Sequence, residues 1–276
     1  MLIEAMDGVL GADVSSVDVC TLDSAGLDAI RVALLQYHVL ALRNQRLDPA
    51  ALSAFAARLG ECEVYPFAES LSGHPYVVPI VKEPEDQSNF GGIWHTDSSY
   101  LPEPPSLTLL YAVELPSSGG DTLFANMHAA YRALSDSTRK GIDGLTAQYT
   151  SALVHDESGA YAQVAGANRN RRAPGPMVTD AVHPVVRTHP HSGSKALYVS
   201  LAHTRCFVGQ SRDESLPLLT QLAEHAIQQE FRTRLRWTVG TLAIWDNRSV
   251  QHFPLNDYPG ERRVMYRVIL KGERPA

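Results

Sequence analysis

The most constraining feature of this sequence is a strict alternation of apolar and charged residues near its C-terminal end. Residues suited to a core alternate there with three arginines: Phe231, Thr233, Leu235 and Trp237 against Arg232, Arg234 and Arg236. Successive side chains of a β-strand point to opposite faces of a sheet, so this period predicts a strand with one buried and one hydrated face. A helix cannot bury such a pattern, because its apolar positions recur every three or four residues.

Short apolar segments recur along the rest of the chain. They predict strands over 14–19, 39–42, 76–81, 106–115, 119–126, 145–150, 181–190, 196–200, 241–247, 250–253 and 262–270. Apolar residues at helical spacing predict helices over 24–38, 49–59, 127–144 and 213–227, the first capped by Ser24 and the third broken at Ser135 and Gly141. Many short strands with few helices favour a mainly β fold, a β-sandwich or jelly roll with added helices.

Composition narrows the class of protein. A net charge of −6 argues against a nucleic-acid binder, which needs an excess of basic residues to contact phosphates. Cys20, Cys62 and Cys206 form no CxxC pair, which argues against a disulfide framework or a zinc ribbon. The N-terminal segment does not look like a signal peptide, and no apolar run reaches the ~18 residues of a membrane span. We therefore expect a cytoplasmic protein that binds neither nucleic acid nor membranes.

The segment Gly91–Tyr100, GGIWHTDSSY, places His95 and Asp97 two residues apart. If this segment is extended, both side chains point to the same side. An imidazole and a carboxylate that converge on one point are two thirds of the 2-His-1-carboxylate face that binds iron(II). His252 follows a predicted strand and a short turn, and it is the candidate for the second imidazole. The histidines at positions 128, 155, 183, 189 and 203 have no comparable sequence context.

Two arginines and a threonine suggest an anion site nearby. Arg263 and Arg267 share parity in the last predicted strand, so both point to one face of the sheet. Two guanidinium groups inside a sheet are costly without anionic partners, and bidentate carboxylate binding is the role that suits arginine best. The alternative is that both face solvent, and parity alone leaves the two faces open. Thr122 follows a Gly-Gly-Asp turn, where its hydroxyl can donate to a carboxylate beside an arginine.

Two polar segments interrupt the predicted strands. Residues 82–94 are predicted to form a mobile active-site loop that leads the chain to His95. Residues 155–181 are rich in Gly, Ala, Asn, Arg and Pro without a steady period, and we predict an active-site lid, with a solvated insertion or a domain boundary as alternatives. Strands of the same character resume after this segment, which favours a single domain over 1–276.

Several sequence blocks, in this order, closely resemble one known family. They are IWHTDSSYLPEPPS, ELPSSGGDTLFANMHAAYRALS, HPVVRTHPHSG with KALYVS, and IWDNRSVQHFPLNDYPGERRVMYRV, and the N-terminal VLGADVSSVDV fits as well. These blocks resemble the taurine dioxygenase and 2,4-dichlorophenoxyacetate dioxygenase family of iron(II)- and 2-oxoglutarate-dependent oxygenases. The resemblance covers most of the chain and implies a cupin-like, double-stranded β-helix core.

The resemblance implies a role for each of the residues singled out above. His95, Asp97 and His252 match the iron ligands of the family. Thr122 and Arg263 match the residues that hold the distal carboxylate of the co-substrate 2-oxoglutarate. The implied cofactors are therefore Fe(II), 2-oxoglutarate as co-substrate, and O2.

The resemblance also implies a substrate pocket, and there the chain departs from the taurine-type enzymes. Arg267 matches an arginine that meets the substrate's anionic group in several members, and Tyr65 matches a pocket tyrosine. Cys62 stands where the taurine-type enzymes carry a histidine, and those enzymes carry an asparagine near the position of Gly91, so the contacts that select taurine are missing. Tyr266 stands where relatives often have histidine.

The implied reaction is hydroxylation of a small organic anion with release of succinate and CO2. The expected substrate is an alkylsulfonate, a sulfate ester, an aryloxyalkanoate or a related carboxylate, and the expected assembly is a homo-oligomer, either a dimer or a tetramer. One alternative is a non-catalytic jelly-roll protein that binds a metal or ligand, but it leaves Arg263 and Arg267 without partners. A zinc hydrolase with the same ligands needs a general base that the neighbouring sequence does not offer.

Overall fold

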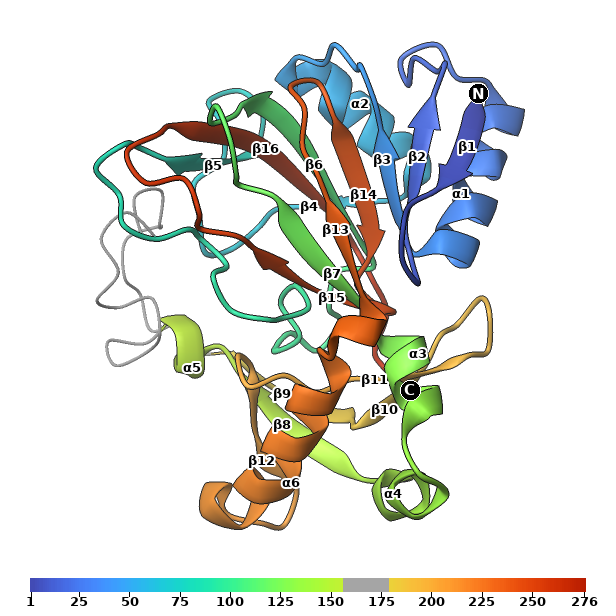
Figure 1. Cartoon of the computed structure of the whole chain (residues 1–276), viewed down its shortest axis with the longest axis vertical. Helices are drawn as coiled ribbons and strands as arrows, with labels where there is room; N and C mark the ends of the chain where they lie inside the picture. The colour runs from blue at the N-terminus through green and yellow to red at the C-terminus, as the bar shows by residue number, and fades with distance from the viewer. Residues whose placement is uncertain (156–178) are drawn as a thin grey trace.

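A sheet of eight strands forms the centre of the molecule in the computed structural model, which describes residues 1–155 and 179–276 (Figure 1). The strand order is β1-β2-β3-β14-β6-β16-β4, and β5 also pairs with β16. Among the strands that the structure describes, only β2 and β3 pair in parallel. The strands are β1 (Leu2–Ala5), β2 (Ala12–Ser15), β3 (Val39–Leu42), β4 (Cys62–Glu63), β5 (Val78–Lys82), β6 (Leu107–Glu114), β14 (Leu242–Asp246) and β16 (Arg263–Leu270).

A smaller antiparallel sheet packs against the large one. Its strands, in the order β13-β7-β15, are β13 (Arg232–Leu235), β7 (Thr122–Asn126) and β15 (Val250–Pro254). Phe124 and Leu235 from this sheet share one buried cluster with Trp245 and Met265 from the large sheet. Two sheets joined through their inner faces form the jelly-roll core that the alternating pattern predicted, and the mainly β fold with added helices is confirmed.

The alternation that suggested the fold is present in β13. Thr233 and Leu235 are buried while Arg234 is exposed, as a half-buried strand requires. Phe231 belongs instead to a short 3-10 turn, η1 (Gln229–Phe231), which leads into the strand.

Helices α1 (Ser24–Tyr37) and α2 (Pro49–Leu59) pack against the large sheet, on the side of β1–β3 in Figure 1. Asp23, rather than Ser24, caps α1, because its carboxylate accepts from the backbone N–H of Gly26. Asp48 caps α2 in the same way, with Pro49 in the first turn. The apolar stripes of both helices and one face of the sheet share a single buried cluster.

The remaining elements form a second layer that lies below the two sheets in Figure 1. They comprise β8 (Thr146–Thr150), β9 (Asp180–Pro184), β10 (Val186–Thr188), β11 (Lys195–Leu197), β12 (Thr204–Phe207), α3 (Met127–Ala133), α4 (Asp136–Ile142), α5 (Ala152–His155) and α6 (Arg212–Ala226). The break predicted at Ser135 separates α3 from α4, and Ser135 caps α4.

The predicted lid can be compared with the structure only at its ends. His155 ends α5, Asp180 begins β9, and residues 156–178 lie outside the described residues. Within the described ranges, no helix combines the length and apolar character that crossing a membrane requires.

Candidate active site

His95, Asp97 and His252 come together at the edge of the small sheet. His252 lies in β15, and its backbone forms an isolated antiparallel bridge with His95: His95 N–H donates to His252 O over 3.2 Å, and the reverse bond is 2.8 Å. The Nε2 atoms of His95 and His252 lie 3.6 and 3.9 Å from Asp97 Oδ1. All three side chains are buried, and their ligand atoms lie within 4.8 Å of one another. Two segments more than 150 positions apart in sequence thus present three metal-ligand groups to one point.

The protonation states suit a metal. Nδ1 of His95 lies 2.6 Å from the carbonyl oxygen of Ile93, which must accept its proton and so leaves Nε2 free as a ligand. Burial, together with the nearby His95, lowers the pKa of His252 to about 3, so this imidazole is neutral at physiological pH. Burial alone would raise the pKa of Asp97, but His95, His252 and Arg267 hold it well below its usual range. Two imidazoles and an ionised carboxylate fit the donor set that iron(II) takes in oxygenases.

Arg263 extends from the first position of β16 into the same cavity, where only 6% of its surface is exposed. Its Nε and Nη2 atoms find no hydrogen-bond partner among the residues that the structure describes. Burial lowers the pKa of this guanidinium, because its surroundings solvate the positive charge poorly. Such a group is stabilised when an anion binds beside it.

Thr122, at the start of β7, lines the same cavity as Arg263. Its Oγ1 accepts a hydrogen bond of 3.0 Å from the indole Nε1–H of Trp237. An indole can only donate, so the proton of the Thr122 hydroxyl remains available for another acceptor. A carboxylate held by Arg263 is such an acceptor.

Arg267 lies further along β16, on the same face as Arg263. Its guanidinium lies over the ring of Tyr65, 4.1 Å from the ring centre, and 5.6 Å from that of Phe90. Nη1 approaches Asp97 Oδ1 to 3.8 Å, while Nε and Nη2 have no hydrogen-bond partner in the described ranges. Arg267 therefore offers two unpaired N–H donors beside the proposed metal position.

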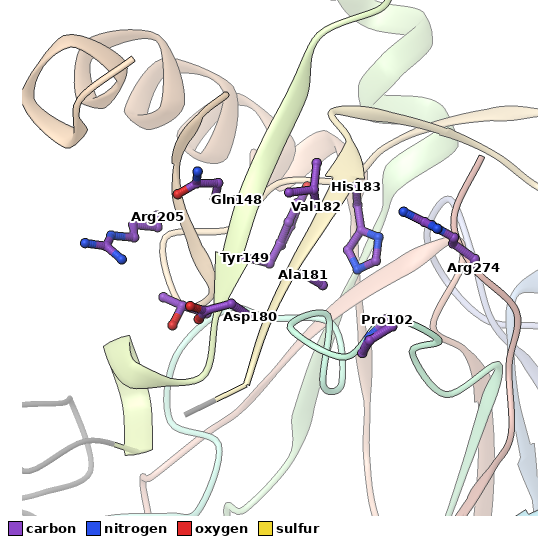
Figure 2. A pocket seen from close by; sticks show the side chains of 10 residues that line it. Pro102, Gln148, Tyr149, Asp180, Ala181, Val182, His183, Arg205 and Arg274 are labelled. Carbon is purple, nitrogen blue, oxygen red and sulfur yellow. The ribbon is translucent and has the colours of Figure 1, made fainter. Parts of the chain in front are cut away.

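The three proposed metal ligands share a small cavity of about 50 Å³ with Thr122, Arg263 and Arg267. It is lined by the following residues: Ile80, Phe90, Gly91, His95, Asp97, Leu110, Thr122, Trp245, His252, Pro254, Arg263 and Arg267. A larger cavity of about 450 Å³ lies beside β8 and β9 and is shown in Figure 2. Its lining includes Arg205 and Arg274 but none of the predicted site residues. The smaller cavity therefore holds the residues predicted to bind the metal and the co-substrate.

Cys62 does not join this group, although sequence reasoning placed it in the substrate pocket. It pairs with Leu270 across the β4–β16 ladder and packs with the apolar cluster beneath α2, with Sγ 4.0 Å from the carbonyl oxygen of Ser53. Cross-strand partners share a face, and Leu270 has the parity opposite to that of Arg263 and Arg267. Tyr266 shares the parity of Leu270 and packs against the same cluster, so it too faces away from the cavity.

Some residues of the site were not identified from the sequence. Trp237 orients Thr122, and Tyr258 donates to Oδ1 of Asn89 over 2.6 Å, while Asn89 donates to the carbonyl oxygen of Leu255 over 2.7 Å. These bonds tie the 82–94 loop to the segment that follows β15. Asn89 lies within a loop that composition identified, but its partners are more than 160 positions away in sequence.

Comparisons with known proteins agree with this geometry. Residues 3–269 match the family model described as taurine catabolism dioxygenase TauD, TfdA family. An alpha-ketoglutarate-dependent sulfate ester dioxygenase of Pseudomonas putida is 34% identical over 271 residues, covering 97% of this chain and 88% of that protein. A (S)-phenoxypropionate/alpha-ketoglutarate-dioxygenase of Sphingobium herbicidovorans is 30% identical and covers 98% and 95% of the two chains.

A solved structure supports the same assignment. The crystal structure of a protein from Burkholderia xenovorans, described as a putative alpha-ketoglutarate-dependent taurine dioxygenase, aligns with a TM-score of 0.83 at 32% identity, covering 100% of this chain and 94% of that one. The resemblance inferred from the sequence blocks is thereby confirmed. The chain belongs to the TauD, TfdA family of alpha-ketoglutarate-dependent dioxygenases, whose cofactors are iron(II), 2-oxoglutarate and O2.

Proposed function

We propose that this protein hydroxylates a small organic anion and converts 2-oxoglutarate to succinate and CO2. The anion is an alkylsulfonate, a sulfate ester, an aryloxyalkanoate or a related carboxylate. The relatives named for sulfate esters and for phenoxypropionate support these classes. The observation that carries the proposal is the presence of two buried guanidiniums with unpaired N–H groups, Arg263 and Arg267, in one cavity with the His95–Asp97–His252 cluster.

In this proposal, His95, Asp97 and His252 hold iron(II). The bound iron supplies the oxygen chemistry, with 2-oxoglutarate as the source of two electrons. The backbone bridge between His95 and His252 holds the two imidazoles, so the ligand set is formed without rearrangement. An iron(II) ion held by these three residues would keep coordination positions for the co-substrate and O2.

Arg263 and Thr122 bind the distal carboxylate of the co-substrate 2-oxoglutarate. The guanidinium donates through its unpaired Nε and Nη2 atoms, which have the fork geometry that matches a carboxylate. The Thr122 hydroxyl donates to the same group, because Trp237 occupies one of its acceptor positions. Trp237 also lies beneath the guanidinium of Arg263, 5.7 Å from the ring centre.

Arg267 binds the anionic group of the organic substrate, and Tyr65 forms the wall behind it. The ring of Tyr65 keeps the guanidinium in place while leaving two of its N–H groups unpaired. An anion held there lies close to Asp97 and so close to the metal. The substrate's C–H bonds next to the anionic group are then the ones presented for oxidation.

The experiment is a screen for succinate release with iron(II), ascorbate and 2-oxoglutarate, across sulfonates, sulfate esters, aryloxyalkanoates and carboxylates. Arg267→Ala should raise the KM for the active anion far more than the KM for the co-substrate. Arg262→Ala is the matched control, because Arg262 is exposed and pairs with Glu83 and Glu114 outside the cavity. Equal effects of Arg267→Ala on both KM values, or no succinate with any class, would contradict the proposal.

We also propose that residues 1–276 form one catalytic domain that works in the cytoplasm as a homo-oligomer of two or four copies. The family match over 3–269 supports the single domain. The 82–94 loop contributes Phe90 and Gly91 to the cavity wall, which supports its role as an active-site loop. Light scattering of the purified protein tests the oligomeric state, and a monomer at working concentration would contradict that part.

A further inference from the structure

The second carboxylate oxygen of Asp97 is held by a buried series of hydrogen-bonded side chains behind the His95–Asp97–His252 cluster. Thr108, near the start of β6, donates its hydroxyl proton to Asp97 Oδ2 over 2.6 Å. The side-chain amide of Asn247, in the turn between β14 and β15, donates to Thr108 Oγ1 over 2.9 Å. Thr108 and Asn247 are 0% and 1% exposed, so no bulk water competes for these bonds.

The direction of each hydrogen bond in this chain is fixed by chemistry. Oδ1 of Asn247 faces the indole Nε1–H of Trp245 at 3.0 Å and the backbone N–H of Asp97 at 3.4 Å. Both of these groups can only donate, so the amide must present its oxygen to them and its NH2 group to Thr108. The Thr108 oxygen thus accepts from Asn247, and its single proton is directed at Asp97.

This arrangement divides the two oxygens of the carboxylate between two tasks. Oδ2 points back into the core and is occupied by Thr108. Oδ1 lies on the side of the ligand imidazoles, 3.6 Å from His95 Nε2 and 3.9 Å from His252 Nε2. A carboxylate that is free to rotate can bind a metal through both oxygens and block one further coordination position.

The turn that carries Asn247 is fixed as well. Thr96, which stands between the first two proposed ligands, donates to the carbonyl oxygens of Asn247 and Val250, both over 2.8 Å. The loop with His95 and Asp97 is therefore attached to the β14–β15 turn by side chains on both sides. A displacement of this turn moves the carboxylate.

We propose that Thr108 and Asn247 are positioning residues that hold Asp97 so that only Oδ1 is presented to the metal, leaving a coordination position for the co-substrate or O2. This inference rests on the proposed role of Asp97 as a metal ligand. Thr108 lies in none of the sequence blocks that pointed to the metal, and Asn247 lies in one of them, IWDNRSVQHFPLNDYPGERRVMYRV, but was given no role there. The hydrogen bonds join β6 to positions 11 and 139 residues away. Outer hydrogen bonds of this kind typically change metal affinity or activity by ~10–100-fold when they are lost.

The test is a titration of the metal-free protein with Co(II) in the absence of oxygen, followed by the visible absorption of the bound ion. Thr108→Val keeps the shape of the side chain but removes the proton donor, and it should weaken Co(II) binding by ~10–100-fold. It should also change the shape of the Co(II) spectrum, because the carboxylate can then bind through both oxygens. Thr108→Ser retains the hydroxyl and should restore both affinity and spectrum.

Two further variants keep the outcomes separate. Thr233→Val makes the same exchange at a buried threonine of β13 whose hydroxyl has no partner in the described part of the chain, and it should leave Co(II) binding unchanged. Asp97→Ala should bind Co(II) far more weakly than Thr108→Val, and wild-type binding by Asp97→Ala would overturn the metal site itself. If Asp97→Ala fails to bind while Thr108→Val binds with wild-type affinity and spectrum, only the positioning role is overturned.

Discussion

The two sides of the cavity differ in how completely their polar groups are satisfied. On the metal side, Asp97, Thr108 and Asn247 make a continuous series of buried hydrogen bonds, and Nδ1 of His252 is the one atom of the proposed ligands without a partner among the described residues. On the anion side, Arg263 and Arg267 each keep two buried nitrogen atoms without a partner among the described residues. Buried polar groups are normally paired, so an unpaired group indicates a ligand that completes it. The difference suggests that the protein forms its metal site in advance and forms its anion sites only together with the anions.

The metal side and the anion side of the cavity are also built from different structural elements. The metal side is built from the start of β6, the turn between β14 and β15, the middle of β15, and the 95–97 segment, which a backbone bridge at His95 joins to β15. The anion side includes the 82–94 loop, which Asn89 and Tyr258 join to the segment after β15 by side-chain bonds. Loops joined to the rest of a protein by side-chain contacts open at lower free energy than strands in a core.

The largest expected effect concerns the metal ligands themselves. If the metal side is preformed, the metal-free protein should bind Co(II) without 2-oxoglutarate, and the bound ion should raise its melting temperature. His252→Ala should lose more affinity than the ~10–100-fold typical of an outer hydrogen bond, because a ligand is removed rather than reoriented. Co(II) titration followed by thermal unfolding measures both quantities. A wild-type protein that takes up metal only when 2-oxoglutarate is present would break the comparison.

A large effect is also expected at Arg263, on the anion side. Arg263→Ala removes two charge-assisted hydrogen bonds, each worth ~1.5–3 kcal/mol, so the KM for the co-substrate should rise by at least about 100-fold. Arg263→Lys retains the charge but not the fork, and it should recover only part of the loss. Steady-state kinetics at varied 2-oxoglutarate concentration gives the values. Co(II) affinity without co-substrate should be unchanged in both variants, and a loss of metal binding would show that the two sides are not separate.

A smaller effect is expected at Trp237, which touches neither metal nor proposed substrate. Trp237→Phe leaves a ring beneath Arg263 but removes the indole donor that orients Thr122. One neutral hydrogen bond contributes ~0.5–1.5 kcal/mol, so the KM for the co-substrate should increase by about 2- to 10-fold. The variant should not alter the KM for the organic anion. If it does, Arg263 and Arg267 respond as one unit rather than as two separate anion sites.

Sequence reasoning selected the side chains that are proposed to carry the chemistry better than it identified the residues that orient them. His95 and Asp97 are two residues apart, and Arg263 and Arg267 share parity, so local periodicity alone predicted which of these side chains share a face. Cys62 was misplaced because its side depends on how the two-residue strand β4 is registered against β16. A shift of one residue would reverse the face, and no local pattern fixes so short a strand.

The orienting residues depend on long-range register in the same way. Thr108 lies opposite Trp245 in the β6–β14 ladder and opposite Ile269 in the β6–β16 ladder. The side chain of Asn247 reaches Thr108 only because the turn after β14 passes back over the Thr108–Trp245 pair. Nothing in SLTLLYAVEL distinguishes Thr108 from any other residue of a buried strand. The fold class could be predicted from period and composition, whereas these contacts require the coordinates of three strands at once.

The most indirect of the expected effects arises behind the metal side, where the stability of the protein should depend on pH. The backbone N–H of Asp246, next to Asn247, donates to the carbonyl oxygen of His38 over 3.0 Å. Burial lowers the pKa of the His38 imidazole to about 4, and the nearby His128 lowers it further than Asp246 raises it. His189 and Arg132, which also face this imidazole, act in the same direction as His128. Below its ordinary value of about 6.5, the unfolded chain therefore binds a proton that the folded chain excludes.

The sign of the effect follows from this difference. Stability from His38 is fully present above about pH 6.5 and is lost as the pH falls toward 4, with a slope of up to ~1.4 kcal/mol per pH unit for one proton. Asn accepts the positive φ of 64° at position 38, so His38→Asn should flatten the slope of the unfolding free energy measured in urea between pH 7 and pH 5. His128 has a pKa lowered by burial as well, so part of the slope should remain. His191→Asn, at an exposed position, is the matched control. If both variants flatten the pH slope of the unfolding free energy equally, the stability of the segment behind the Asn247 turn does not depend on the neutral imidazole of His38.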